Sequence, residues 1–236
     1  MGPKLDHLRH ATTQQAADYF AHEAPEDLVA ALRATSDDDL LRLVGRDEIR
    51  SVAVTGILDR LHEYAVPERL AAVAGVVRFD LERRGVLLER HGLVLDRGHL
   101  TLLADVAHTE RVDVVLRTSL TRFVRLVSGE RNAGLEFLGG TLDIEGDAEL
   151  ALAIGGLFRV PGTAQVAVDP RALDPVEVAV ALKGVSADHL RKVMSSGFRP
   201  VVLGEVFRRL PDFVHPRRAR CADLTVGFRL LGSASG

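Results

Sequence analysis

The sequence predicts an α+β protein with a mainly antiparallel sheet, and the order of its patterns carries this prediction. Apolar residues recur at helical spacing over 26–44 and 49–64, and a strand-rich stretch follows over 74–118. A helical pattern at 119–128 then leads to one last strand pattern at 142–145 and a final helix. Strands that follow one another without alternating helices are typical of α+β folds rather than of alternating βα units.

Glycines divide the strand-rich stretch into short runs. Gly85, His91-Gly92 and Arg97-Gly98 stand between runs of apolar and β-branched residues, where we expect tight turns. The predicted strands are 74–82, 85–92, 93–98, 100–106 and 111–118.

The segment FLGGTLDIEGDAELALAIGGLF, residues 137–158, combines a turn, a strand, a second turn and a helix. Leu142 and Ile144 alternate with polar residues, which predicts a strand with one buried face. Asp147 follows a glycine and is well placed to cap a helix from Ala148 to Phe158. That helix has almost no polar side chain beyond Glu149, so we expect apolar packing on more than one side.

The small residues of this helix have two interpretations. Alanine and glycine beside large apolar residues either allow close backbone packing or leave room for an apolar ligand. Composition alone favours close packing.

Overall composition excludes several classes of function. The protein is 47% hydrophobic and 27% charged, with a net charge of −3 and no Trp among its 5% aromatic residues. A basic field and base-stacking aromatics are therefore missing, and we expect no nucleic-acid partner. The lone Cys221 excludes an internal disulfide and suits a reducing compartment. No apolar run reaches membrane-spanning length and the first residues lack a signal-peptide pattern, so we expect a cytoplasmic protein.

Motifs that carry catalysis are missing as well. The sequence has no G-x-S-x-G, G-x-x-x-x-G-K or G-x-G-x-x-G motif in a suitable context. His7 and His10, with His22 further on, suggest a metal site only weakly, and a solvated tail is the favoured interpretation. Nearby arginines could activate Cys221, although a small, partly buried residue is favoured there. We therefore expect no catalytic residue, no metal and no cofactor.

A partial repeat follows the segment 137–158. ALKGVSADHL at 181–190 matches ALRATSDDDL at 31–40, and 199–230 aligns with 50–81 after a slip of one residue. We interpret this as a duplication whose second copy stops after one strand, at 224–232. A lone strand cannot form a sheet, so it needs cover from the first copy or from a second molecule. The second copy is thus predicted to be an appendage or a dimerisation element.

A basic cluster lies in this second copy. Arginines near an anionic membrane each contribute about 1 kcal/mol of attraction, which predicts a transient contact with lipid headgroups. Solvated arginines on a helix face are the favoured alternative. The cluster consists of Arg208, Arg209, Arg217, Arg218 and Arg220.

The stretch 118–158 resembles the signature region of the sterol carrier protein type 2 family. The resemblance covers about 49–163, and GTLDIEGD at 140–147 is its most specific part. The residues that carry it are Phe123, Leu126, Gly129, Asn132, Phe137, Gly140, Leu142, Ile144, Gly146, Asp147, Leu150, Ala151, Leu157 and Phe158.

This resemblance implies a five-stranded, mainly antiparallel sheet with helices on one face, enclosing a hydrophobic tunnel. It also implies non-catalytic binding, and intracellular transfer, of a fatty acyl group, an acyl-CoA or a sterol-like lipid. The alternative is a non-transporting dimerisation or interaction module on the same fold, with a homodimer as its product. The residues expected to line the tunnel are Phe123, Leu126, Phe137, Leu142, Ile144, Leu150, Ala153, Leu157 and Phe158.

Four regions follow from these patterns. The predicted division is a polar N-terminal tail at 1–25, a sterol carrier-like domain at 26–163, a linker at 164–176 and the truncated second copy at 177–236.

Overall fold

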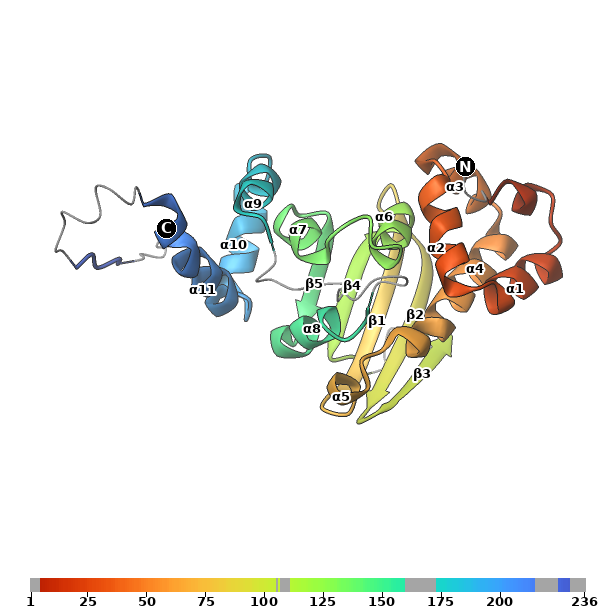
Figure 1. The fold of residues 1–236 in the computed structure, drawn as a ribbon, viewed down its shortest axis with the longest axis horizontal. Helices are drawn as coiled ribbons and strands as arrows, with labels where there is room; N and C mark the ends of the chain where they lie inside the picture. Colours follow the sequence, from red (N-terminus) through yellow and green to blue (C-terminus); the bar gives the residue numbers. More distant parts are fainter. Residues whose placement is uncertain (1–4, 105, 107–110, 160–172, 215–224, 230–236) are drawn as a thin grey trace. The chain divides into compact units, whose positions relative to one another are not determined.

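The structure, a computed structural model, describes residues 5–104, 106, 111–159, 173–214 and 225–229. The protein divides into two compact units, Met1–Arg199 and Pro200–Gly236 (Figure 1). The first unit contains the sheet and most of the helices, and each unit is described separately below.

The first unit is built on one five-stranded sheet with the strand order β3-β2-β1-β4-β5. β1 pairs in parallel with β4, and the other three pairings are antiparallel. The predicted α+β class with a mainly antiparallel sheet is therefore confirmed. The strands are β1 (Ala74–Arg83), β2 (Val86–Asp96), β3 (His99–Ala104), β4 (Val114–Ser119) and β5 (Leu142–Gly146).

Two of the three predicted turns form. Arg84 and Gly85 have φ values of 52° and 77° between β1 and β2, and Arg97 and Gly98 have 38° and 110° between β2 and β3. Two consecutive residues with positive φ are the signature of the tightest hairpin turns, and glycine adopts this conformation without strain.

The turn predicted at His91-Gly92 is wrong, because β2 runs through this dipeptide without a break. Gly92 is needed there for close packing rather than for a turn. A Cβ atom on Gly92 would lie 2.2 Å from Cγ2 of Val106, which is itself buried. Glycine inside a strand often marks such a close approach.

Within the predicted tail at 1–25, the described residues form a 3-10 helix, η1 (Leu5–Arg9), and α1 (Thr13–His22), which bury Leu5, Leu8 and Phe20. α1 packs along α4, where a Cβ atom on Gly56 would lie 2.8 Å from Cβ of Phe20.

The helices before the sheet are shorter than the sequence suggested. The pattern at 26–44 divides at Ser36, whose side chain accepts a hydrogen bond from the amide of Asp39 and starts a new helix. The pattern at 49–64 ends in a 3-10 turn. The helices are α2 (Pro25–Ala34), α3 (Asp37–Leu43), α4 (Asp47–Asp59), η2 (Arg60–Tyr64) and α5 (Pro67–Leu70).

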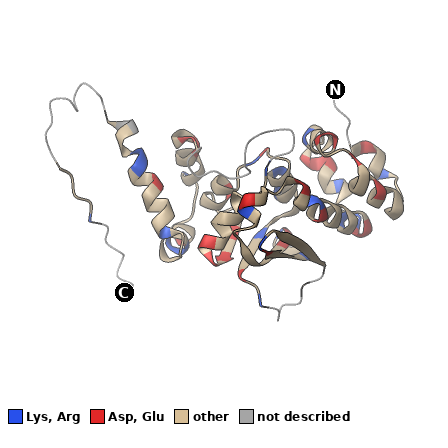
Figure 2. Ribbon diagram, turned by 60° about the horizontal axis from the view of Figure 1, so that its bottom comes forward, with Lys and Arg blue, Asp and Glu red and all other residues tan. Residues whose placement is uncertain are grey.

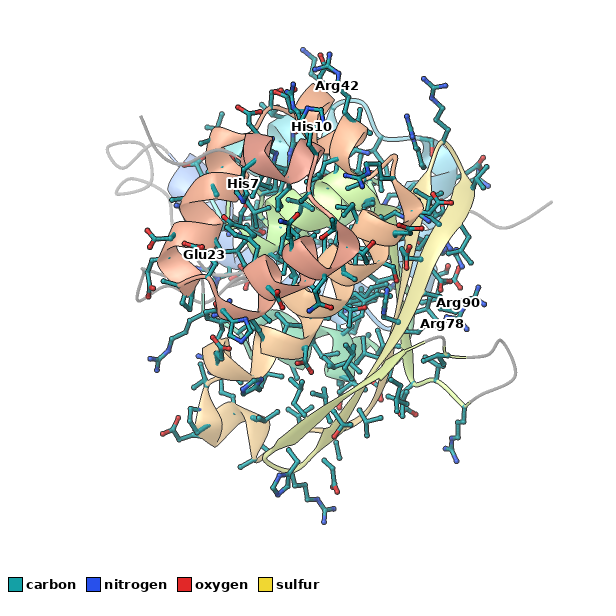
Figure 3. The ribbon with its side chains drawn as sticks, turned by 90° about the vertical axis from the view of Figure 1, so that its right-hand side faces the viewer. His7, His10, Glu23, Arg42, Arg78 and Arg90 are labelled. Carbon is teal, nitrogen blue, oxygen red and sulfur yellow. The ribbon has the colours of Figure 1, made fainter. Side chains whose placement is uncertain are left out.

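Helices after β4 cover the sheet on one side, which Figures 1 and 3 show. Phe123 of α6 packs edge-on against Phe79 of β1, with ring centroids 6.0 Å apart. α7 contacts β5, whereas α8 contacts β4 and β5. These helices are α6 (Leu120–Val127), α7 (Ala133–Leu138) and α8 (Ala148–Gly155).

Arg125 ties the N-terminal helices to this layer. Its guanidinium donates to the carbonyls of Leu32 and Thr35 at 2.9 and 2.6 Å, and it pairs with Asp37 at 2.7 Å. Arg125 thus donates hydrogen bonds to carbonyls at the end of α2 and pairs with the first residue of α3. Because Arg125 belongs to α6, these contacts hold both helices against α6.

The predicted second copy begins inside the first unit. α9 (Pro175–Leu182), α10 (Ala187–Ser195) and α11 (Arg199–Arg209) are followed by η4 (Leu210–Phe213), the same order as α2, α3, α4 and η2. Ser186 caps α10 through the amide of His189, as Ser36 caps α3. The matching order of helices agrees with the predicted duplication, which stays a prediction.

The strand predicted at 224–232 does not form in the part that the structure describes. Residues 225–229 have no regular secondary structure, and Val226 and Phe228 are exposed. An isolated strand has no partner for its backbone groups, which explains the difference. Phe228 contacts Phe207 of α11 within the second unit, with ring centroids 5.4 Å apart.

Candidate functional site

Register places four residues in one line across the middle of the sheet. Phe79 pairs with His91 on one side and with Leu116 on the other, and Leu116 pairs with Ile144. Side chains of directly paired residues share a face, and Phe79 meets α6, so this central row faces the helices.

The central row is less covered toward β5 than the rows beside it. On β4, Val114 and Thr118 are buried, whereas Leu116 between them is partly exposed. On β5, Leu142 is buried and Ile144 is partly exposed. The centre of β4 is thus less covered than the residues on either side of it on the same face, and apolar surface is accessible at Leu116 and Ile144.

The predicted lining residues divide into two groups by exposure. Phe123, Phe137, Leu142, Leu150 and Leu157 are buried. Leu126, Ile144, Ala153 and Phe158 are partly exposed. All nine belong to the helix layer, to β5 or to the segment that follows α8, and their role as a lining stays a prediction.

α8 is positioned from both ends. Asp147 caps it through the amides of Glu149 and Leu150, as the sequence predicts. Leu150 packs over the start of β1, where a Cβ atom on Gly75 would lie 2.6 Å from its Cδ2. Beyond the helix, Phe158 bridges to Ala65, which anchors the end of the signature segment beside η2.

Phe137 contacts residues of the first unit that follow the signature segment, by which we mean residues 118–158. Its ring lies 4.6 Å from that of Phe198 and 6.1 Å from that of His189, centroid to centroid. His189 also places Nε2 2.8 Å from the carbonyl oxygen of Phe137. The helices after the signature segment therefore cover α7, which the sequence did not indicate.

A buried polar group stands at the other end of the central row. His91 is 4% exposed, and its Nε2 lies 3.4 Å from Oε2 of Glu89. Glu89 pairs with Arg50 of α4 at 2.7 Å. Burial alone would raise the pKa of Glu89, but the nearby ring of His91 and the hydrogen bond from Arg50 outweigh it and hold that pKa below its usual value.

The opposite side of the sheet carries a row of charges. Arg90, Asp80, Arg117 and Asp143 are register partners across four strands and alternate in sign. Figure 3 shows Arg78 and Arg90 on the side away from the helices, and Figure 2 shows both signs of charge on the strands.

Asp80 is the centre of this charged row. It is 2% exposed, and its carboxylate lies 3.0 Å from Arg78, 2.9 Å from Arg90 and 3.6 Å from Arg117. Burial would raise its pKa, but the hydrogen bonds and charges of Arg90 and Arg78 lower it below the usual value. Such a saturated carboxylate is structural, because it has no free acceptor directed at a ligand.

The other residues singled out by sequence are scattered. His7 packs against Tyr19, and His22 lies 2.9 Å from the carbonyl of Asp18. The described residues include no cluster of three or more His, Cys, Asp or Glu that could hold a metal ion. Among these residues, no helix is long and apolar enough to cross a membrane.

The basic cluster is only partly described. Arg208 pairs with Glu205 at 2.6 Å, and Arg209 is 8% exposed with the same carboxylate 3.7 Å away. Arg217, Arg218, Arg220 and Cys221 lie outside the described residues.

The described first unit is an α+β fold: it has a mixed five-stranded sheet, helices over one side and a partly uncovered apolar centre. Residues 54–159 match the model of the SCP-2 sterol transfer family. The predicted resemblance to the sterol carrier protein type 2 family is therefore confirmed over this segment.

Solved structures with related folds include three of different origin. Sterol Carrier Protein 2 from Yarrowia lipolytica, in its apo form, is 24% identical over 44% of this chain and 86% of its own, with a TM-score of 0.35. Sterol Carrier Protein-2 from Aedes aegypti, in complex with palmitate, is 14% identical over 42% and 86%, with a TM-score of 0.32. A sec-alkylsulfatase from Pseudomonas sp. is 13% identical over 66% of this chain, with a TM-score of 0.40, but the match spans only 28% of that enzyme.

No curated protein has a sequence that matches this one.

Sequence reasoning missed three members of the site. Leu116 lies in a predicted strand, but its face could not be assigned until the register with Ile144 was known. Phe79 and His91 lie on strands far from the signature segment, and a single buried histidine has no local sequence signal.

Proposed function

We propose that the SCP-2 segment binds an apolar lipid without catalysis and transfers it within the cytoplasm. The ligand would lie against the partly exposed centre of the helix-facing side, at Leu116 and Ile144. The nine predicted lining residues, Ile144 among them, would line a hydrophobic tunnel between the helix layer and the sheet.

One observation carries the proposal. Leu116 is partly exposed although the residues on either side of it on the same face, Val114 and Thr118, are buried. Apolar surface at the middle of a sheet is normally covered, and an apolar ligand gains about 25 cal/mol for each Å² that it removes from water. The name of the matching family, sterol transfer, supports the same class of ligand.

A pair of neighbouring substitutions tests where the ligand binds. Leu116→Asn places an amide against the ligand, and its desolvation costs about 1–3 kcal/mol, which corresponds to a loss of affinity of roughly tenfold or more. Val115→Asn is the matched control, because Val115 is also partly exposed but faces the opposite side of the sheet. Displacement of a fluorescent fatty acid measures both, and equal effects of the two substitutions would contradict the proposed location.

Native mass spectrometry of the purified protein, followed by solvent extraction, tests binding itself. A stoichiometric lipid that leaves the protein on extraction is the expected result. A protein that binds neither a co-purified lipid nor an added fatty acid would overturn the proposed function.

A second candidate, an interaction module that forms a homodimer, is favoured by a separate observation. Three apolar side chains of the second unit are exposed, namely Val206, Phe207 and Phe228. Val206 and Phe207 lie on α11, and the ring of Phe228 contacts that of Phe207. Apolar side chains gathered in this way commonly mark an interface. Sedimentation velocity distinguishes the candidates, because Phe207→Ser should dissociate a dimer while leaving lipid binding intact.

Contact of the basic cluster with anionic membranes remains a separate prediction. Its described members, Arg208 and Arg209, lie near Glu205, which reduces the charge available to a headgroup. Flotation with vesicles that contain phosphatidylserine tests it, and unchanged binding after Arg217→Gln and Arg218→Gln would count against it.

A further inference from the structure

His91 is a buried side chain whose hydrogen bonds are not satisfied. It is 4% exposed, and neither ring nitrogen makes a well-formed hydrogen bond to any residue that the structure describes. Buried polar groups are nearly always paired, so an unpaired ring nitrogen inside a protein needs an explanation.

Glu89 decides which nitrogen of His91 carries the proton. Nε2 lies 3.4 Å from Oε2 of Glu89, and a carboxylate only accepts hydrogen bonds. The proton therefore belongs on Nε2.

The carboxylate of Glu89 is already paired with Arg50 at 2.7 Å, and Asp47 pairs with Arg50 at the same distance. A neutral ring protonated on Nε2 presents Nδ1 as a hydrogen-bond acceptor.

The position of His91 relates this acceptor to the proposed ligand site. His91, Phe79, Leu116 and Ile144 occupy successive strands in one row on one face. Three inter-strand spacings separate His91 from Ile144, which is roughly 14 Å. An extended hydrocarbon of lipid length that enters at Ile144 and crosses Phe79 would bring its far end to the position of His91.

From these observations we infer that Nδ1 of His91 accepts a hydrogen bond from a hydroxyl group at the inner end of the ligand. This inference rests on the proposed function and adds a requirement to it, namely that the preferred ligand carries a donor at its end. Phe79, Leu116 and Ile144 would contact the apolar part of the molecule, whereas His91 would select its polar end.

Binding of hexadecanol and of hexadecyl methyl ether by the whole protein tests the inference. The two probes share their hexadecyl group, but only the alcohol donates a hydrogen bond. The native protein should bind the alcohol roughly tenfold more tightly, the factor that corresponds to one hydrogen bond. His91→Leu should reduce that preference to less than about twofold while the ether binds as before.

Three further variants make the result specific. His99→Leu is the matched control, because His99 is exposed at the start of β3, and it should keep the full preference. His91→Gln, which retains an acceptor, should restore part of it, and His91→Phe replaces the leucine variant if that variant does not fold.

A ¹⁵N NMR spectrum of the histidine ring gives a readout that a purely structural role would not move. The Nδ1 resonance should shift on addition of the alcohol and stay in place on addition of the ether. Equal binding of the two probes by the native protein, or a preference that survives His91→Leu, would overturn the inference alone. A native protein that binds neither probe would instead overturn the proposed function.

Discussion

The two sides of the sheet differ although they share the same strands. Phe79 and Asp80 are consecutive residues of β1, yet Phe79 meets the aromatic ring of Phe123 while Asp80 meets three arginines. The row that contains Asp80 is held by ion pairs, and the row that contains Phe79 ends in apolar residues that are partly exposed.

This difference indicates which side suits an apolar ligand. An apolar molecule on the charged side would have to displace paired and partly buried ions, and breaking such pairs is costly. On the helix-facing side, Leu116 and Ile144 gain from any apolar cover. The charged side is therefore held by ion pairs between strands, whereas the helix-facing side retains partly exposed apolar surface at Leu116 and Ile144.

The largest predicted effect belongs to Asp80→Asn. Removing this carboxylate takes away the counter-charge of the buried Arg78, which should lower the free energy of unfolding by about 3–5 kcal/mol. Urea denaturation at neutral pH measures the loss.

Asp143→Asn is the control at the open end of the same charged row. The Asp143 side chain is 29% exposed, and an exposed pair contributes less than about 1 kcal/mol. A cost for Asp80→Asn no greater than that for Asp143→Asn would show that the row acts as an ordinary set of surface ion pairs.

Gly92→Ala should cost about 1–3 kcal/mol, because the new Cβ atom would lie 2.2 Å from Val106. Val106→Ala removes the clashing methyl groups, so the double substitution should be less destabilised than the sum of the two single ones. Additive effects in this cycle would mean that the close approach of Val106 does not explain Gly92.

The pKa of Asp80 predicts how stability depends on pH. Its pKa is lower in the folded protein than its ordinary value of 3.8. The carboxylate therefore stabilises the fold fully above pH 3.8, and this contribution is lost as the pH falls through the lower folded value. Urea midpoints in the native protein should fall as the pH is lowered from about 5 to about 2, and Asp80→Asn should flatten that part of the profile.

The order of elements was predictable because it depends on local patterns. Leu142 and Ile144 alternate with polar residues, and Asp147 has the chemistry of a helix cap, so β5 and α8 follow from neighbouring residues alone. The same holds for the hairpin turn at Gly85.

The pairing of distant residues was not predictable in the same way. Gly92 resembles a turn residue until Val106 is placed above it, and the polar start of the sequence hides Leu5 and Phe20, which are buried only by tertiary packing. His91 joins the site through its register with Phe79, and no pattern within β2 specifies that register.

The smallest predicted effect concerns the open end of the charged row. Lys192 of α10 reaches Asp143 at 2.7 Å and Glu145 at 3.1 Å, which joins a C-terminal helix to the edge strand β5. All three groups are substantially exposed, so Lys192→Ala should lower stability by only about 0.2–1 kcal/mol.

Hydrogen exchange reports this contact more sensitively than overall stability does. An edge strand exposes unpaired backbone groups unless another element lies beside it, and Lys192 of α10 contacts β5 through Asp143 and Glu145. Lys192→Ala should speed amide exchange in Leu142–Gly146 and in α10, with no change in β2 at the far side of the sheet. Arg191→Ala is the control, since its partner Asp188 lies on the same helix. Faster exchange of both segments only in the Lys192 variant would show that the charged row continues beyond the sheet and holds α10 in place.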